Sequence, residues 1–106
     1  MIRSTELPDD ARIWLAREGG FVAAPGLSRP REIALVDCRD DQRLAIRRVL
    51  DACRLQAVPA AGAADQRFFR IVISRDSEPD TPLDELLIDE THAPTDLVSL
   101  WQNGPE

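Results

Sequence analysis

The stretch from Ile13 to Val22 constrains the fold of this chain most strongly. It starts as a strand-like segment whose apolar side chains alternate in direction, and it then reaches a glycine pair at Gly19 and Gly20. Two adjacent glycines can adopt positive φ without a steric penalty, so they can turn the chain sharply or let another backbone approach. Because a second strand-like run begins at Arg31, the sequence predicts a hairpin with a long loop between its strands.

The loop of this hairpin has two interpretations. In the first it is a structural turn, and Phe21 folds back onto the core. In the second the Gly-Gly-Phe-Val segment lies extended in the groove of a partner protein. A later segment, Pro25-Gly26-Leu27, is either another point of contact with the partner or a plain connecting loop. The candidate contact residues are Gly19, Gly20, Phe21, Val22, Pro25, Gly26 and Leu27.

Residue periodicity predicts the central helix. Apolar residues fall at i, i+3, i+4 and i+7 between Ile46 and Cys53, which is one stripe of a helix. We expect this helix over about residues 40–54, with Asp40 or Asp41 as its N-cap.

Alternating apolar residues, interrupted by prolines and glycines, predict the other elements. Two strands are expected at about residues 12–18 and 31–36, a strong one at 67–74 and a weaker one at 83–89. A polar connection with two prolines would join the last two strands. Pro94 suits the first turn of a final helix, which Asn103-Gly104-Pro105 would end.

The order β-β-α-β-β-α predicts an α+β two-layer sandwich, in which a four-stranded, mainly antiparallel sheet carries two helices on one face. The other face would be open, with Trp14, Val36, Phe68 and Val72 as its exposed apolar members. We expect a flexible N-terminal arm over residues 1–10, a single domain over 11–102 and a C-terminal tail over 103–106.

Charge is unevenly distributed along the chain. All 13 basic residues are arginine, against 19 acidic residues, which gives a net charge of −6. Residues 39–75 carry eight arginines and four acids, whereas residues 76–106 carry nine acids and no arginine. Because phosphate groups and anionic lipids require a basic field, nucleic acid and membrane surfaces are disfavoured as partners.

The residues that usually support catalysis or metal binding are scarce. Two cysteines are too few for a disulfide framework or a self-contained zinc site, and Cys53 is expected to be a buried thiol on the apolar helix face. His92 is the single histidine, so no nucleophile–base pair is suggested. We expect no cofactor and no enzymatic activity. Acidic residues stand where a signal peptide would be apolar, which favours the cytoplasm.

An ordered set of short motifs, spread over roughly residues 11–101, resembles the emfourin family. These are small bacterial proteins that inhibit protealysin-like members of the thermolysin family of zinc metallopeptidases. The motifs that carry the resemblance are Arg17-Glu18-Gly19-Gly20-Phe21, the run from Ile46 to Ala52, the run from Leu55 to Pro59, Asp65-Gln66, and Pro94 with Leu97, Leu100 and Trp101.

The resemblance implies a tight-binding protein inhibitor that occupies the active-site cleft of a thermolysin-like peptidase, with no cofactor of its own. We expect it to be monomeric when free. Such peptidases favour a bulky apolar side chain just after the cleaved bond, which Phe21 or Leu27 would supply. His92, or a carboxylate such as Asp89 or Glu90, is a candidate contact to the partner's zinc.

Two other functions stay open. The chain could be a protein-interaction module or adaptor with no peptidase target. It could also be an acidic mimic of nucleic acid, although the basic middle of the chain disfavours this. The acidic stretch from Asp76 to Glu90 is either a solvated edge or a surface that steers a basic partner.

Overall fold

The computed structural model describes residues 7–19, 30–58 and 67–105. Its elements follow the predicted order, with two short 3-10 helices added. They are β1 (Ala11–Gly19), β2 (Arg31–Ala34), η3 (Leu35–Asp37), α1 (Asp40–Gln56), β3 (Arg67–Arg75), β4 (Glu78–Asp89), η4 (Glu90–His92) and α2 (Thr95–Asn103).

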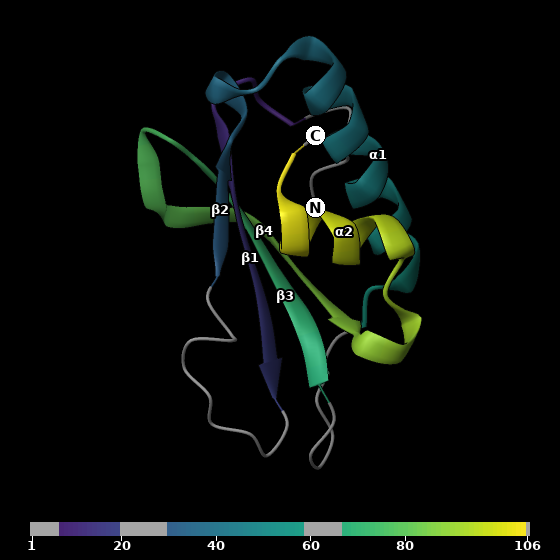
Figure 1. Cartoon of the computed structure of the whole chain (residues 1–106). Coiled ribbons are helices and arrows are strands. Elements are labelled where there is room, and N and C mark those ends of the chain that lie inside the picture. The colour runs from purple at the N-terminus through teal and green to yellow at the C-terminus, as the bar shows by residue number, and fades with distance from the viewer. Residues whose placement is uncertain (1–6, 20–29, 59–66, 106) are drawn as a thin grey trace.

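The four strands form one sheet in the order β2-β1-β3-β4, and every neighbouring pair is antiparallel. Both helices pack on the same face of this sheet (Figure 1). The predicted α+β two-layer sandwich is therefore confirmed. The central strands β1 and β3 pair over nine positions, from Ala11 opposite Arg75 to Gly19 opposite Arg67.

The core lies between the sheet and the helices, because alternate strand residues and one helix stripe point into that space. On the sheet side it contains the inward series of β1 and β3, which includes Ile13, Leu15 and Phe69. On the helix side the predicted stripe of α1 is buried, and Cys53 is fully shielded from solvent. The buried thiol expected at Cys53 is confirmed.

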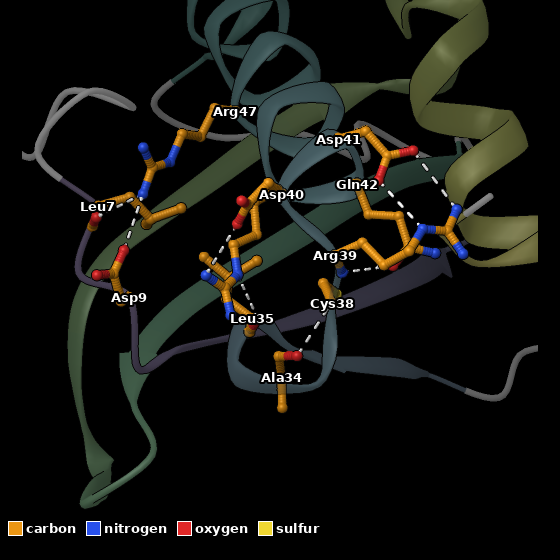
Figure 2. A network of polar contacts seen from close by, with 11 residues as sticks. Leu7, Asp9, Ala34, Leu35, Cys38, Arg39, Asp40, Asp41, Gln42 and Arg47 are labelled. Carbon is orange, nitrogen blue, oxygen red and sulfur yellow. Dashed lines mark hydrogen bonds and ion pairs between the residues drawn. The ribbon is translucent and has the colours of Figure 1, made fainter.

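Polar contacts fix the entry into α1 (Figure 2). The N-cap is Arg39, whose backbone amide donates to Oε1 of Gln42 at 2.8 Å. The cap expected at Asp40 or Asp41 is wrong, because both aspartates lie in the first turn. Negative charge is still favourable there, near the positive end of the helix dipole.

The N-terminal segment also reaches this region. Leu7 is 4% exposed and belongs to the core. Arg47 of α1 donates to the carbonyl oxygen of Leu7 and to the carboxylate of Asp9, both at 3.4 Å. In Figure 2 the Arg47 side chain extends from α1 toward both acceptors. Residues 7–9 therefore pack against the domain.

Two strand boundaries differ from the prediction. β2 ends at Ala34 and not near Val36, because the carbonyl oxygen of Leu35 accepts from the Cys38 amide and from Nε of Arg43 and so closes the 3-10 turn η3. The second difference concerns the polar connection expected before the last strand. A short turn at residues 76–77 replaces it, and β4 already starts at Glu78.

In the sequence, Pro79 and Pro82 predict a loop over residues that the structure places at the start of β4. β4 is an edge strand, where a missing backbone donor on the outer side is tolerated. The pairing between β3 and β4 is also irregular from Ile73 to Arg75, so extra residues of β4 are accommodated without breaking the ladder.

Candidate partner-binding site

The chain segments that the sequence analysis predicts to bind a partner begin or end at one end of the sheet. β1 ends there at Gly19, β3 starts there at Arg67, and β4 ends there at Asp89 before η4 begins. The segment of residues 20–29 joins the end of β1 to the start of β2. We call this end of the molecule, defined by Gly19, Arg67 and the stretch from Asp89 to His92, the loop end.

Arg17 holds the end of β1 against the helical layer. Its guanidinium forms a half-buried salt bridge with Glu90 of η4, through Nε and Oε2. The same guanidinium lies over the ring of Trp101 in α2, 5.7 Å from the ring centre. Trp101 in turn meets Phe69 of β3 edge to face, with ring centres 5.8 Å apart. Four elements are thus fixed together two residues before Gly19.

Arg31 holds the other flank, at the start of β2. Its Nε donates to the carbonyl oxygen of Trp101 at 2.8 Å, and its Nη2 donates to that of Gln102 at 3.0 Å. These carbonyls belong to the last turn of α2, which has no partners for them within the helix. Positive charge at a helix C-terminus is also favoured by the helix dipole.

The turn after α2 lies close to the Arg31 side chain. Gly104 has a φ of 78°, and its amide donates to the carbonyl oxygen of Leu100 at 2.9 Å. A Cβ atom at this position would lie 2.9 Å from Nη1 of Arg31. The left-handed backbone therefore favours glycine here, and a Cβ atom would also displace the guanidinium of Arg31.

The described residues include only part of the predicted contact set. Gly19 is the last residue of β1, opposite Arg67. Glu90 and His92 lie in η4, where His92 is exposed and Glu90 pairs with Arg17. Their proposed contact with a partner's zinc stays a prediction. Gly20, Phe21, Val22, Pro25, Gly26 and Leu27 lie outside the described residues.

The open face of the sheet is less apolar than predicted. Trp14, Phe68 and Val72 lie on it and are half-buried, and Val36 is 51% exposed but belongs to η3 and not to a strand. Arginine side chains lie across this face. Arg70 pairs with Glu18 and Glu85, at 2.8 and 2.7 Å, and lies over the ring of Phe68. Three of the four apolar residues expected on the open face are therefore there, but only partly exposed, and the placement of Val36 on the sheet is wrong.

Arg12 also forms salt bridges with two carboxylates, nearer the other end of the sheet. It pairs with Asp76 at 2.7 Å and with Glu32 at 3.3 Å. The hydrogen bond to Asp76 raises the pKa of Arg12, and that to Glu18 raises the pKa of Arg70. A shallow cavity of about 380 Å³ lies between the two arginines and is lined also by Trp14 and Val72. Salt bridges thus border the small apolar area that this face retains.

Folding brings the acidic stretch from Asp76 to Glu90 into contact with arginines of other elements. Four of its carboxylates pair with arginines of other elements: Asp76 with Arg12, Asp84 with Arg54, Glu85 with Arg70, and Glu90 with Arg17. Much of the charge separation in the sequence is therefore neutralised locally in the folded molecule.

Nothing in the described part of the chain resembles a metal centre or a membrane span. Among residues 7–19, 30–58 and 67–105, no three His, Cys, Asp or Glu side chains are grouped to hold a metal ion. No helix within these ranges is long and apolar enough to cross a membrane. Cys38 and Cys53 are both free thiols.

The sequence interpretation missed the roles of Arg17 and Arg31, although a signal was present. Both fall in the inward register of their strands, Arg17 with Ile13 and Leu15, and Arg31 with Ile33. A charged residue in a core-facing register must find a partner, because burying an unpaired charge is strongly unfavourable. This rule predicts pairing but does not identify the partner.

The fold and the loop end define a small α+β protein in which two anchored strands, β1 and β2, flank a connecting segment. The family model described as Emfourin matches residues 15–105, and the chain belongs to this family. A solved structure is also similar: emfourin from Serratia proteamaculans, described as an M4 family peptidase inhibitor. It is 39% identical to this chain, with 98% of this chain and 96% of the other covered and a TM-score of 0.50. No curated protein matches the chain.

Proposed function

We propose that this protein inhibits a thermolysin-like, protealysin-like zinc metallopeptidase by placing the segment between β1 and β2 in the active-site cleft. The observation that carries the proposal is the 39% identity, over nearly the whole chain, to a protein described as an M4 family peptidase inhibitor. Such a protein binds without transforming a substrate, so it requires neither a cofactor nor catalytic residues of its own.

The anchoring of the loop end supports this mechanism physically. An inhibitor that resembles a substrate must keep its segment ordered, because ordering a flexible loop on binding lowers the affinity. Arg17 and Arg31 fix the two strands from which residues 20–29 depart, through Glu90 and through the end of α2. Anchoring of both flanking strands opposes the separation of the chain ends that cleavage requires.

Inhibition of peptide hydrolysis tests the proposal. The purified chain is mixed with a protealysin-like peptidase, and we expect activity to be lost at stoichiometric concentration. Full activity with an excess of the chain would contradict the proposal and favour an adaptor without a peptidase target.

Two alanine variants then locate the contact. We expect Phe21→Ala or Leu27→Ala to raise the inhibition constant by about thirtyfold, which is the loss of a hot-spot side chain worth about 2 kcal/mol. Val36→Ala is the matched control, because Val36 is an apolar residue that is 51% exposed in η3, away from the loop end. If both variants inhibit as well as the control, the assignment of residues 20–29 is wrong.

A further inference from the structure

β1 extends further toward the loop end than β2 does. β2 begins at Arg31, which lies opposite Leu15, so the register gives residues 16–19 of β1 no partner in β2. On their other side the same residues pair with β3, as far as Gly19 opposite Arg67. Among the described strands, β3 alone therefore holds the end of β1, and side-chain contacts with the helical layer provide the remaining support.

The ring of Trp101 in α2 makes these contacts. Arg17 and Phe69 lie directly opposite each other on β1 and β3, and the Trp101 ring contacts both. The guanidinium of Arg17 lies 5.7 Å from the ring centre, and the ring of Phe69 meets it edge to face at 5.8 Å. A cation over an aromatic face and an edge-to-face aromatic pair are both favourable. Trp101 therefore holds one cross-strand pair two residues before the end of β1.

The backbone of the same turn of α2 supports the start of β2. The carbonyl oxygens of Trp101 and Gln102 accept from Nε and Nη2 of Arg31, at 2.8 and 3.0 Å. Trp101 thus contacts β1 through its ring and β2 through its carbonyl, and these two strands flank residues 20–29. Figure 1 shows α2 with its C-terminal end toward β2 and its start toward η4. The last turn of α2 therefore fixes β1 and β2 relative to each other.

We propose that Trp101 is a positioning residue for inhibition, which holds the two strands flanking residues 20–29 without touching the peptidase. This inference rests on the proposed function. Its physical basis is pre-organisation, because a segment between fixed ends loses less conformational freedom on binding than one between mobile ends. Glu90 also pairs with Arg17, but the two side chains are 28% and 36% exposed, so water screens that salt bridge. The Trp101 ring is therefore the main support of Arg17.

Two variants of Trp101 test the role of its ring in inhibition. Trp101→Leu keeps an apolar side chain against the core but removes the aromatic face. We expect it to raise the inhibition constant for a protealysin-like peptidase by about tenfold. Trp101→Phe keeps an aromatic face for Arg17 and Phe69, so its inhibition constant should stay within about threefold of the parent value. Inhibition by Trp101→Leu as strong as by the parent would overturn the proposal.

A core variant separates positioning from general stability. Ile73→Val is the matched control, because Ile73 is fully buried in β3 but lies six residues from Arg67 at the loop end. The variant should lower the midpoint of thermal unfolding, since it removes a buried methyl group. At a temperature where all variants are folded, its inhibition constant should equal that of the parent. If Ile73→Val weakens inhibition as much as Trp101→Leu, stability explains the effect and the proposal is wrong.

A double-mutant cycle distinguishes positioning from direct contact with the peptidase. If the ring acts through Arg17, the variant Arg17→Met/Trp101→Leu should inhibit no more weakly than Arg17→Met alone. Losses that add up would show that Trp101 acts independently of Arg17 and would overturn the proposal. Arg31→Met combined with Trp101→Leu should give additive losses, because Arg31 binds backbone carbonyls that the leucine variant retains.

Hydrogen exchange of the free protein tests the anchoring without a peptidase. We expect Trp101→Leu to lower the protection of the amides in residues 16–19 and to leave residues 12–15 unchanged, because the latter pair with both β2 and β3. Unchanged protection at residues 16–19 would overturn the proposal. If the parent chain does not inhibit, the proposed function fails and this inference fails with it. If the parent and Trp101→Leu inhibit equally well, this inference alone fails.

Discussion

Cys53 sits in the middle of the buried face of α1, where its thiol is fully shielded from solvent. Burial raises the pKa of this thiol from 9.0 to about 12, because the charged thiolate would lose its hydration. The half-buried Cys38 has a raised pKa for the same reason. Both thiols are therefore poor nucleophiles at neutral pH, which agrees with a structural role.

The raised pKa of Cys53 predicts a loss of stability in alkali. Below pH about 9 the thiol is protonated in both the folded and the unfolded chain, so its contribution to stability is complete. Between pH about 9 and about 12 the unfolded chain releases the proton and the folded chain does not. The free energy of unfolding should then fall by up to about 1.4 kcal/mol per pH unit.

Denaturant unfolding at several alkaline pH values, under reducing conditions, measures this fall. The chain has no tyrosine and no lysine, so the cysteines are the side chains that titrate in this range. Cys53→Ala should be less stable overall but should show a shallower dependence on pH. A slope equal to that of the parent protein would contradict this assignment.

At the scale of elements, a buried salt bridge joins α1 to β4. Nη1 of Arg54 lies 2.6 Å from Oδ2 of Asp84, and the two side chains are 13% and 10% exposed. Nε and Nη2 of Arg54 are also buried, without a hydrogen-bond partner among the described residues. The two charges are removed from water with incomplete hydrogen bonding, so the pair contributes little net stability although each partner depends on the other.

This arrangement predicts opposite results for single and double substitutions. Asp84→Ala should lower the free energy of unfolding by about 3–5 kcal/mol, because it leaves the guanidinium charge buried and unpaired. The apolar double variant Arg54→Met/Asp84→Leu should recover most of that loss. Urea unfolding measures both effects.

The surface salt bridge of Arg12 with Asp76 provides the control. Its side chains are 36% and 45% exposed, so Arg12→Ala should change stability far less than Asp84→Ala does, because water screens the pair. A loss for Asp84→Ala as small as that for Arg12→Ala would show that the Arg54–Asp84 pair is not effectively buried.

At the scale of the whole molecule, the acidic start of β4 and the loop end are separated. β4 begins with the exposed residues 78–82 and ends at Asp89, beside η4. The regular part of β4, from Asp84 to Asp89, alone spans about 17 Å at about 3.3 Å per residue. This is about twice the Debye length of about 8 Å at physiological salt. In Figure 1 the turn between β3 and β4 projects on the side away from η4.

The separation predicts that the start of β4 does not guide a peptidase to the loop end. Neutralising it by Glu78→Gln/Asp80→Asn should change the association rate constant by no more than about twofold at physiological ionic strength. Stopped-flow measurement with the target peptidase tests this. A decrease of about tenfold or more would place these carboxylates in the binding surface.

The correct and incorrect parts of the sequence interpretation have different physical origins. The helix over Asp40–Gln56 and the alternation of β3 were predicted correctly, because both depend on periodicity within a short stretch. The start of β4 was missed, because two prolines are tolerated there only through its position at the sheet edge. The turn at Val36 depends on the distant Arg43 side chain, which donates to the Leu35 carbonyl.

For the candidate site, the sequence alone determined which segment joins the first two strands and which family it resembles. The tertiary structure decided how that segment is supported. Arg17 pairs with Glu90 across 73 positions of the chain, and Arg12 pairs with Asp76 across 64. Local periodicity determines which face of an element a residue occupies, but sheet order and strand register determine which distant side chain it meets.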